Sequence, residues 1–137
     1  MSESTEQNGN LREELAARTA QIQEDRGYNF DTFKWLAEHD PEFEATRLSA
    51  VEMTYTRKDG ALEPKVRELI AICLLSFRMY HSVRAHIARA LREGASVSEV
   101  VQALEMASIP GGQATLHFGL DHLIALEQSN PELFTNR

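Results

Sequence analysis

The chain has 137 residues, 42% of them hydrophobic, which is enough apolar material for the core of one domain. Its formal net charge of −7 argues against binding to nucleic-acid phosphates, and no run of about 20 apolar residues could span a membrane. The one cysteine, Cys73, permits neither an internal disulfide nor a dithiol cycle within the chain, so a reducing cytoplasm is the expected location.

The first ten residues, MSESTEQNGN, are polar throughout. They lack the apolar segment of a secretion signal, so we expect a disordered tail over residues 1–10. No repeat or internal linker follows. We therefore expect one domain over residues 11–137.

The first half of this domain has the boundary signals of three helices. Gly27 is placed to end the first helix, Asp31 to cap the second and Pro41 to open the third. Lys58-Asp59-Gly60 is typical of a turn. The expected helices cover residues 11–25, 31–38 and 41–53.

The second half has clearer signals. Pro64 suits a first helical position, Gly94 ends a helix, and Ser96 with Glu99 forms a capping-box pattern. The unbroken apolar run 69–75 predicts a helix that is buried on all sides. The expected helices cover residues 64–77, 82–93, 96–108 and 114–127. The chain is therefore predicted to be an all-α domain of six or seven helices.

Two side chains on successive helices of this half could form a catalytic pair. Glu68 has Ile72 and Leu75 as helical neighbours, so its carboxylate is poorly solvated, a setting that suits proton transfer. His86 shares a face with Val83 and can act as an acid or base near neutral pH. The alternatives are a structural ion pair of Glu68 with Arg67, Arg84 or a partner chain, and a hydrogen-bonded core histidine for His86.

Other polar residues near these helices are weaker candidates. Tyr80 and His81 lie at a helix junction, where sites are common, although an exposed histidine there is equally ordinary. His117 is followed one turn later by Asp121, which could orient the imidazole or form a surface pair with it.

Metal and thiol chemistry are both disfavoured by the spacing of the ligands. The pairs His81/His86 and His117/His122 are five residues apart, which places the two side chains on different faces of a helix. We therefore expect no metal site. Cys73 lies in the apolar run and is expected to be an inert, structural thiol.

Two consecutive segments carry a resemblance to a known family. Residues 62–92, LEPKVRELIAICLLSFRMYHSVRAHIARALR, and 93–112, EGASVSEVVQALEMASIPGG, together resemble the central part of the carboxymuconolactone decarboxylase-like, or alkyl hydroperoxidase D-like, family. The resemblance extends over residues 62–126. It implies an all-α fold and a homo-oligomer, either a trimer or a hexamer.

The family has a redox branch that carries a Glu, a Cys-x-x-Cys pair and a His. Glu68 and His86 match the Glu and His, but the cysteine positions fall on Met79 and Ser82. Neither side chain can form a disulfide, so disulfide-reductase or peroxidase activity is not expected. The other branch resembles γ-carboxymuconolactone decarboxylase, which needs no cysteine pair and no cofactor.

The resemblance leads to one main functional hypothesis. The protein would be a cofactor-independent lyase or isomerase for a small anionic carbonyl compound, with aromatic-ring degradation as one source. The expected site residues are the catalytic His86, Glu68 and His81, and the substrate-binding Arg84, Tyr80, Ser82 and His117. The alternative is a non-catalytic or ligand-binding family member.

Overall fold

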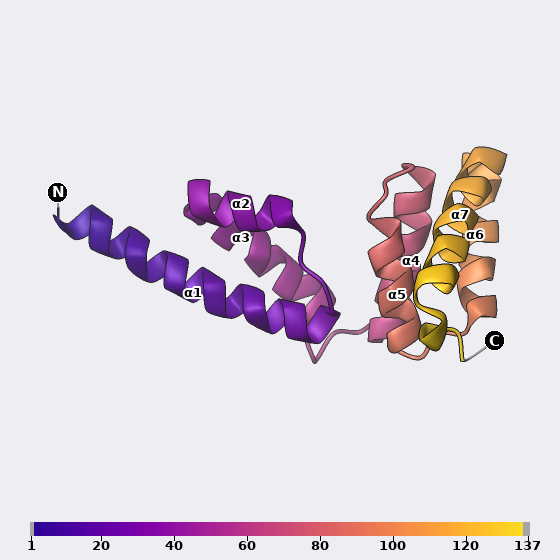
Figure 1. Cartoon of the computed structure of the whole chain (residues 1–137), viewed down its shortest axis with the longest axis horizontal. Helices are drawn as coiled ribbons and strands as arrows, with labels where there is room; N and C mark the ends of the chain where they lie inside the picture. The colour runs from indigo at the N-terminus through magenta and orange to yellow at the C-terminus, as the bar shows by residue number, and fades with distance from the viewer. Residues whose placement is uncertain (1, 136–137) are drawn as a thin grey trace. The chain divides into compact units, whose positions relative to one another are not determined.

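The computed structural model describes residues 2–135, with side chains from residue 6 onward. These residues form seven α-helices and no strand, which confirms the all-α prediction (Figure 1). The backbone divides into two compact units, Met1–Gly60 and Ala61–Arg137. None of the described helices has the length and hydropathy that crossing a membrane requires. The sequence analysis expected one domain over 11–137, and that expectation stays a prediction.

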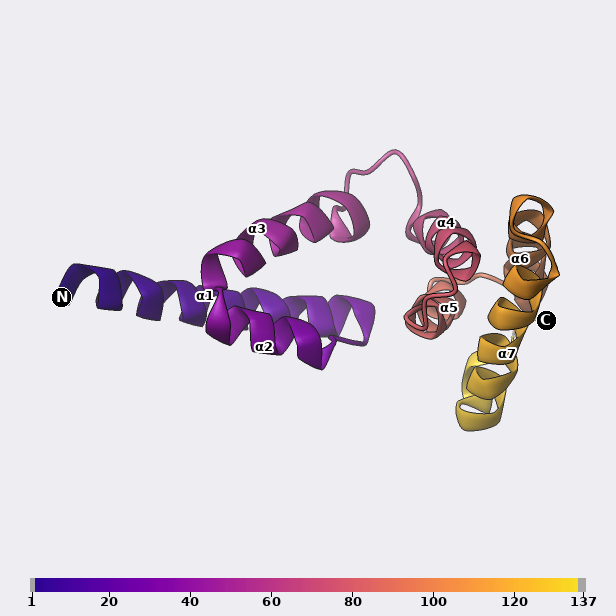
Figure 2. The same cartoon turned by 90° about the horizontal axis from the view of Figure 1, so that it is seen from above.

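The first unit contains α1 (Ser2–Arg26), α2 (Asp31–His39) and α3 (Pro41–Val51), followed by a π-helical turn at Glu52–Thr56. Figure 2 shows α2 and α3 beside the long α1, and α3 packs on both of the others. The core of this unit is small. Its fully buried apolar side chains form one cluster: Leu15, Ile22 and Leu48.

Two expectations for this unit are corrected by the structure. Residues 2–10 continue α1 and do not form a disordered tail, while Met1 lies outside the described residues. No proline interrupts residues 2–26, and Glu6 and Gln7 favour the helix. Asp31 is the first residue of α2 and not its cap, and it pairs with Lys34 at 3.2 Å. Gly27 ends α1 with a positive φ of 77°, as predicted.

The second unit contains four helices whose starts match the sequence signals. These are α4 (Pro64–Phe77), α5 (Val83–Arg92), α6 (Val97–Gly111) and α7 (Gln113–Ser129), and a 3₁₀ turn at Pro131–Leu133 follows. Helix α6 continues through Pro110 to Gly111, beyond its predicted end at residue 108. The capping box of Ser96 and Glu99 is fully formed. Helix α4 contacts each of the other three helices and is therefore central to the unit.

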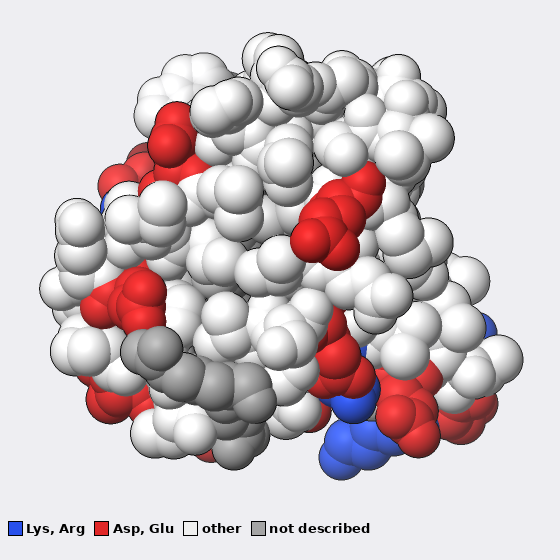
Figure 3. Space-filling view, turned by 90° about the vertical axis from the view of Figure 1, so that its right-hand side faces the viewer, with Lys and Arg blue, Asp and Glu red and all other residues white. Residues whose placement is uncertain are grey.

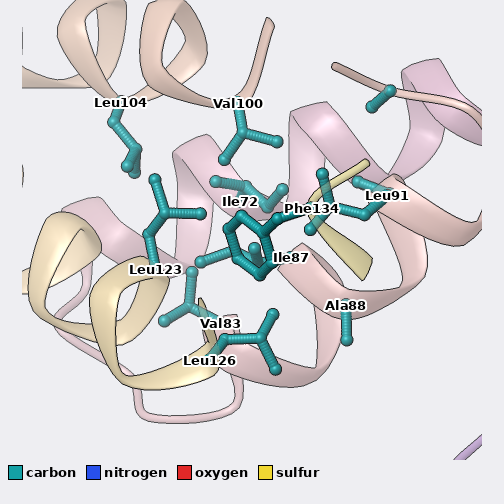
Figure 4. Close-up of a cluster of buried hydrophobic side chains, with 12 residues drawn as sticks. Ile72, Val83, Ile87, Ala88, Leu91, Val100, Leu104, Leu123, Leu126 and Phe134 are labelled. Carbon is teal, nitrogen blue, oxygen red and sulfur yellow. The ribbon is translucent and has the colours of Figure 1, made fainter. Parts of the chain in front are cut away.

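The core of the second unit draws side chains from all four helices. Figure 4 shows Ile72 of α4, Ile87 of α5, Leu104 of α6 and Leu123 of α7 converging on one another. Phe134, after the last turn, closes the same cluster. This burial fixes α4 against α5, which is the interface that carries the candidate site.

Helix α4 is not buried on all sides, contrary to the sequence prediction. Ile70, Leu74 and Phe77 recur at helical spacing and form an exposed stripe, in which Leu74 is 59% exposed. The reason is geometric, because the three helices of its own unit cover only part of its circumference. We call these three residues the α4 stripe.

Candidate functional site

Glu68 and His86 meet in the interface between α4 and α5. The His86 Nδ1 lies 2.7 Å from the Glu68 Oε2, which confirms the predicted approach of the two groups. The two side chains are 2% and 11% exposed respectively. Their catalytic role stays a prediction, but their positions on facing helices are fixed by the core beneath them.

The donor in this hydrogen bond depends on the charge of Glu68. When the Glu68 carboxylate is ionised it can only accept, so the Nδ1 of His86 then carries the proton that it donates. In the neutral ring the remaining Nε2 is then an acceptor. A carboxylate that orients a histidine in this way is a common arrangement in acid–base sites.

Arg89 joins the pair from the same face of α5, three residues after His86. It is buried, and its Nε lies 3.8 Å from the Glu68 Oε1 without a hydrogen-bond partner in the described part of the chain. Its Nη2 binds the Glu93 Oε1 at 3.0 Å. We call His86, Glu68, Arg89 and Glu93 the α4–α5 polar chain.

Arg89 and Glu93 are not among the site residues predicted from the sequence. A signal for Arg89 is present, because it follows His86 at the i+3 spacing of one helical face. The ion-pair alternative for Glu68 names Arg67 and Arg84 instead. Arg67 is also buried, but its Nε donates to the carbonyl oxygen of Leu62 at 2.7 Å.

The structure places Arg84 at the end of α7. Its Nη2 donates to the backbone oxygen of Ala125 at 3.2 Å and to the Ser129 Oγ at 2.6 Å. These groups belong to the carboxyl end of the helix, where a cation is favoured. Arg84 therefore helps to terminate α7, and no contact with Glu68 is formed.

Histidine 122, which the sequence analysis did not select, lies in the same region as Arg84. Burial is the main cause that lowers the pKa of His122, and the charges of Arg84 and His81 lower it further, while Asp121 opposes them. His81 is exposed and its ring contacts Tyr80 at 4.7 Å. No signal within α7 could have shown this gathering, because Arg84 and His81 are distant in sequence.

The remaining predicted residues are more scattered. Ser82 is buried at the start of α5 but makes no side-chain cap. His117 is exposed, and it forms no ion pair with Asp121 within the described residues. The structure thus brings Glu68 and His86 together, and it does not place His117 in contact with them.

The junction between α4 and α5 contains a strained backbone position. Met79 has a φ of 51°, the only positive value at a described residue other than glycine. This left-handed conformation completes the end of α4, because the amide of Tyr80 donates to the carbonyl of Leu75 at 2.9 Å. Strain of this kind costs of order 1 kcal/mol and is often found beside functional sites.

Cys73 lies on α4, away from this junction. Its Sγ is 3.2 Å from the carbonyl oxygen of Ala103, and burial raises the pKa of the thiol. A protonated thiol is a poor nucleophile. The structure therefore agrees with the prediction of a structural cysteine.

Comparisons with known proteins identify the same family that the sequence resembles. Residues 41–121 match the model of the carboxymuconolactone decarboxylase family. The fold is similar to a crystal structure of a "putative carboxymuconolactone decarboxylase" from Burkholderia xenovorans LB400, with a TM-score of 0.75 and 18% identity over 91% of this chain and 97% of that one. That likeness establishes the fold alone. The sequence matches no curated protein.

Proposed function

The chain belongs to the carboxymuconolactone decarboxylase family, and on that premise we propose that it is a cofactor-independent lyase or isomerase. Its substrate would be a small anionic carbonyl compound, such as a lactone acid from aromatic-ring degradation. The observation that carries this proposal is the buried hydrogen bond of 2.7 Å between His86 and Glu68. It provides an oriented imidazole, which is the group that proton transfer to carbon needs.

The proposed chemistry is a decarboxylation followed by protonation. The bond between carbon and the substrate carboxylate breaks, CO₂ leaves, and the electron pair passes into the conjugated carbonyl as a dienolate. The imidazolium of His86 then protonates the carbon and recovers a proton from solvent. Glu68 holds the ring and balances its positive charge while that form exists.

The further residues of this proposal lie at the α4–α5 junction, on α5 and, for His117, on α7. His81 is the third catalytic candidate, and Tyr80, Ser82, Arg84 and His117 are the substrate-binding candidates. Arg84 would be available to a substrate carboxylate only through the guanidinium nitrogens that do not bind α7, since its Nη2 is engaged there. This arrangement makes Tyr80 and His81, both exposed, the best placed of the group.

A ligand-binding member without turnover is the alternative, and one observation favours it. The His86 side chain is only 11% exposed, whereas an acid–base catalyst must reach its substrate. In that case the α4–α5 polar chain would be a buried structural network. Redox chemistry is disfavoured by a different observation, because partial burial raises the pKa of the Cys73 thiol and Met79 and Ser82 stand where a cysteine pair would be needed.

We also propose that the chain assembles as a homo-oligomer, a trimer or a hexamer, in the cytoplasm. The α4 stripe leaves large apolar side chains in water, and on α6 Met106 and Ile109 do the same, with Ile109 87% exposed. Contiguous apolar surface of this kind is typical of protein interfaces. Figure 3 shows a face on which residues other than Lys, Arg, Asp and Glu dominate, with acidic residues scattered among them and basic residues near one edge.

The test is turnover of small unsaturated keto and lactone acids, followed as CO₂ release or as a change in ultraviolet absorbance. His86→Ala should lower kcat about 10²–10⁴-fold, the usual range for a general acid–base, with the helical content retained. His39→Ala is the matched control, because His39 lies in the first unit. Binding of an acid without turnover would favour the alternative, and undiminished turnover by His86→Ala would refute the proposed role.

A further inference from the structure

Arg89 has a position that the hydrogen bond between Glu68 and His86 does not explain. Its guanidinium is buried in the α4–α5 interface, and arginine stays charged there. Placing a permanent charge inside a protein is costly unless carboxylates lie beside it. Glu68 and Glu93 meet that need from two directions, with Arg89 between them.

The two contacts of Arg89 are unequal. The Nη2 binds the Glu93 Oε1 at 3.0 Å, which is hydrogen-bonding distance. The Nε is 3.8 Å from the Glu68 Oε1, so it attracts that oxygen electrostatically without a hydrogen bond. The other oxygen of Glu68, Oε2, is the one that His86 uses. Each carboxylate oxygen of Glu68 thus has a different basic group beside it.

We propose that Arg89 is a positioning residue for His86. Held by Glu93, its guanidinium faces the Glu68 Oε1 and thereby turns the Oε2 toward the imidazole. The Glu68 carboxylate then keeps the His86 proton on Nδ1. This inference rests on the proposed acid–base role of His86, since a fixed tautomer matters most for a group that transfers protons.

The order of the α4–α5 polar chain gives the inference a specific consequence. Without the charge of Arg89, Glu68 loses one of the groups that hold its carboxylate, so rotation or protonation of the carboxyl becomes easier. A rotated or protonated carboxyl no longer restricts the imidazole to one tautomer. Loss of Glu93 should also weaken the restriction of His86 to one tautomer, but less strongly, because it loosens Arg89 without removing its charge.

The experiment is heteronuclear NMR of the full chain with ¹⁵N-labelled histidine, which distinguishes the two neutral tautomers of each ring. The signals of His86 are assigned with His86→Gln. In the unaltered protein at mildly basic pH, His86 should be a single Nδ1–H tautomer. Arg89→Met should convert it into a mixture, Glu93→Gln should give a smaller admixture, and Arg89→Lys should restore much of the original form.

Arg92→Met is the matched control, because it removes the same charge from an exposed position of α5. It should leave the His86 tautomer unchanged. If Arg89→Met does not fold, Glu93→Gln still decides the matter. An unchanged His86 tautomer in folded Arg89→Met, or in Glu93→Gln when Arg89→Met does not fold, would overturn the inference, and so would an Arg89→Lys protein as mixed as Arg89→Met. The readout needs no substrate, so a failure to find turnover would count against the proposed function and leave this result intact.

Discussion

The two compact units of the chain are stabilised in different ways. The second unit, residues 61–137, buries a continuous cluster of apolar side chains from all four of its helices. In the described part of the first unit, residues 1–60, the corresponding buried cluster consists of Leu15, Ile22 and Leu48. Because hydrophobic stabilisation scales with buried apolar area, the second unit has the larger share of it.

The first unit relies on arginine contacts to a greater extent. Arg18 binds Glu52 at 2.8 Å, Arg47 binds Glu44 at 2.6 Å, and the Arg47 guanidinium lies 3.5 Å from the centre of the Phe33 ring. Arg26 contacts the rings of both Tyr28 and Tyr55. A solvent-accessible ion pair such as that of Arg18 contributes about 0.2–1 kcal/mol, whereas Arg26 and Glu44 are buried. A helical unit can thus be held by many small polar contacts where its core is thin.

The comparison also concerns buried carboxylates, of which each unit has one among the residues whose side chains are described. Glu44 in the first unit makes two hydrogen bonds to Arg47, and Glu68 in the second lies between His86 and Arg89. The difference is in the partners. The Arg47 side chain is 23% exposed and can reach water, whereas Arg89 is buried.

The largest expected effect is therefore the loss of folding stability in Glu68→Ala, which should exceed the loss in Glu44→Ala. Removing Glu68 leaves the buried charge of Arg89 without its inner partner and should cost about 3–5 kcal/mol of stability. Glu44→Ala should cost clearly less, because Arg47 can become solvated. Amide hydrogen exchange measured separately for α1–α3 and α4–α7 reports both values. Equal losses in the two units would break the comparison.

Helix caps offer a second matched pair. Ser96→Ala removes half of a reciprocal capping box in the second unit, and about 1–2 kcal/mol should be lost. Asp40 caps α3 through a single bond to the Phe43 amide at 3.1 Å, so Asp40→Ala should cost about 0.5–1 kcal/mol. Urea denaturation followed by circular dichroism measures both. If Asp40→Ala lost more stability than Ser96→Ala, the number of cap hydrogen bonds would not determine which cap contributes more.

Removing a single methylene from each buried cluster compares how tightly the two cores are packed. Ile87→Val, at a position with no exposed surface, should cost about 1–1.5 kcal/mol, and Ile22→Val, at the edge of its smaller cluster, about 0.5 kcal/mol. The same substitution is made in both units, so side-chain chemistry cancels from the comparison. Thermal unfolding of the two variants measures both losses of stability. A larger loss in Ile22→Val than in Ile87→Val would mean that the first unit is the better packed.

The smallest effect expected is the pH dependence that His122 gives to the second unit. Its folded-state pKa is lowered from the ordinary value of 6.5, so the unfolded chain binds the proton more readily. The contribution of His122 is therefore complete above pH 6.5 and is lost as the pH falls from there through the lowered pKa. His122→Gln should flatten this slope, measured as urea midpoints across the range. His117→Gln, at an exposed position of α7, is the control and should leave the slope in place.

Much of the helical layout and part of the candidate site could be predicted from the sequence. Pro41, Pro64 and the box of Ser96 and Glu99 act within one turn of the helix that they open, so their effect is local and visible in sequence. Glu68 and His86 were identified because each is a polar residue on an apolar helical face, and a buried carboxylate must find a partner.

Only the tertiary structure decided which basic groups accompany that pair and which apolar groups stay in water. Arg89 became the neighbour of Glu68 because α5 packs on α4 in one rotation, while Arg84, five residues earlier, was carried to α7. The α4 stripe is exposed because the three helices packed on α4 leave that side open. Helix caps depend on residues that are neighbours in sequence. Burial and ion pairing depend on residues that the fold brings together from distant positions, and a single sequence does not show which of them come into contact.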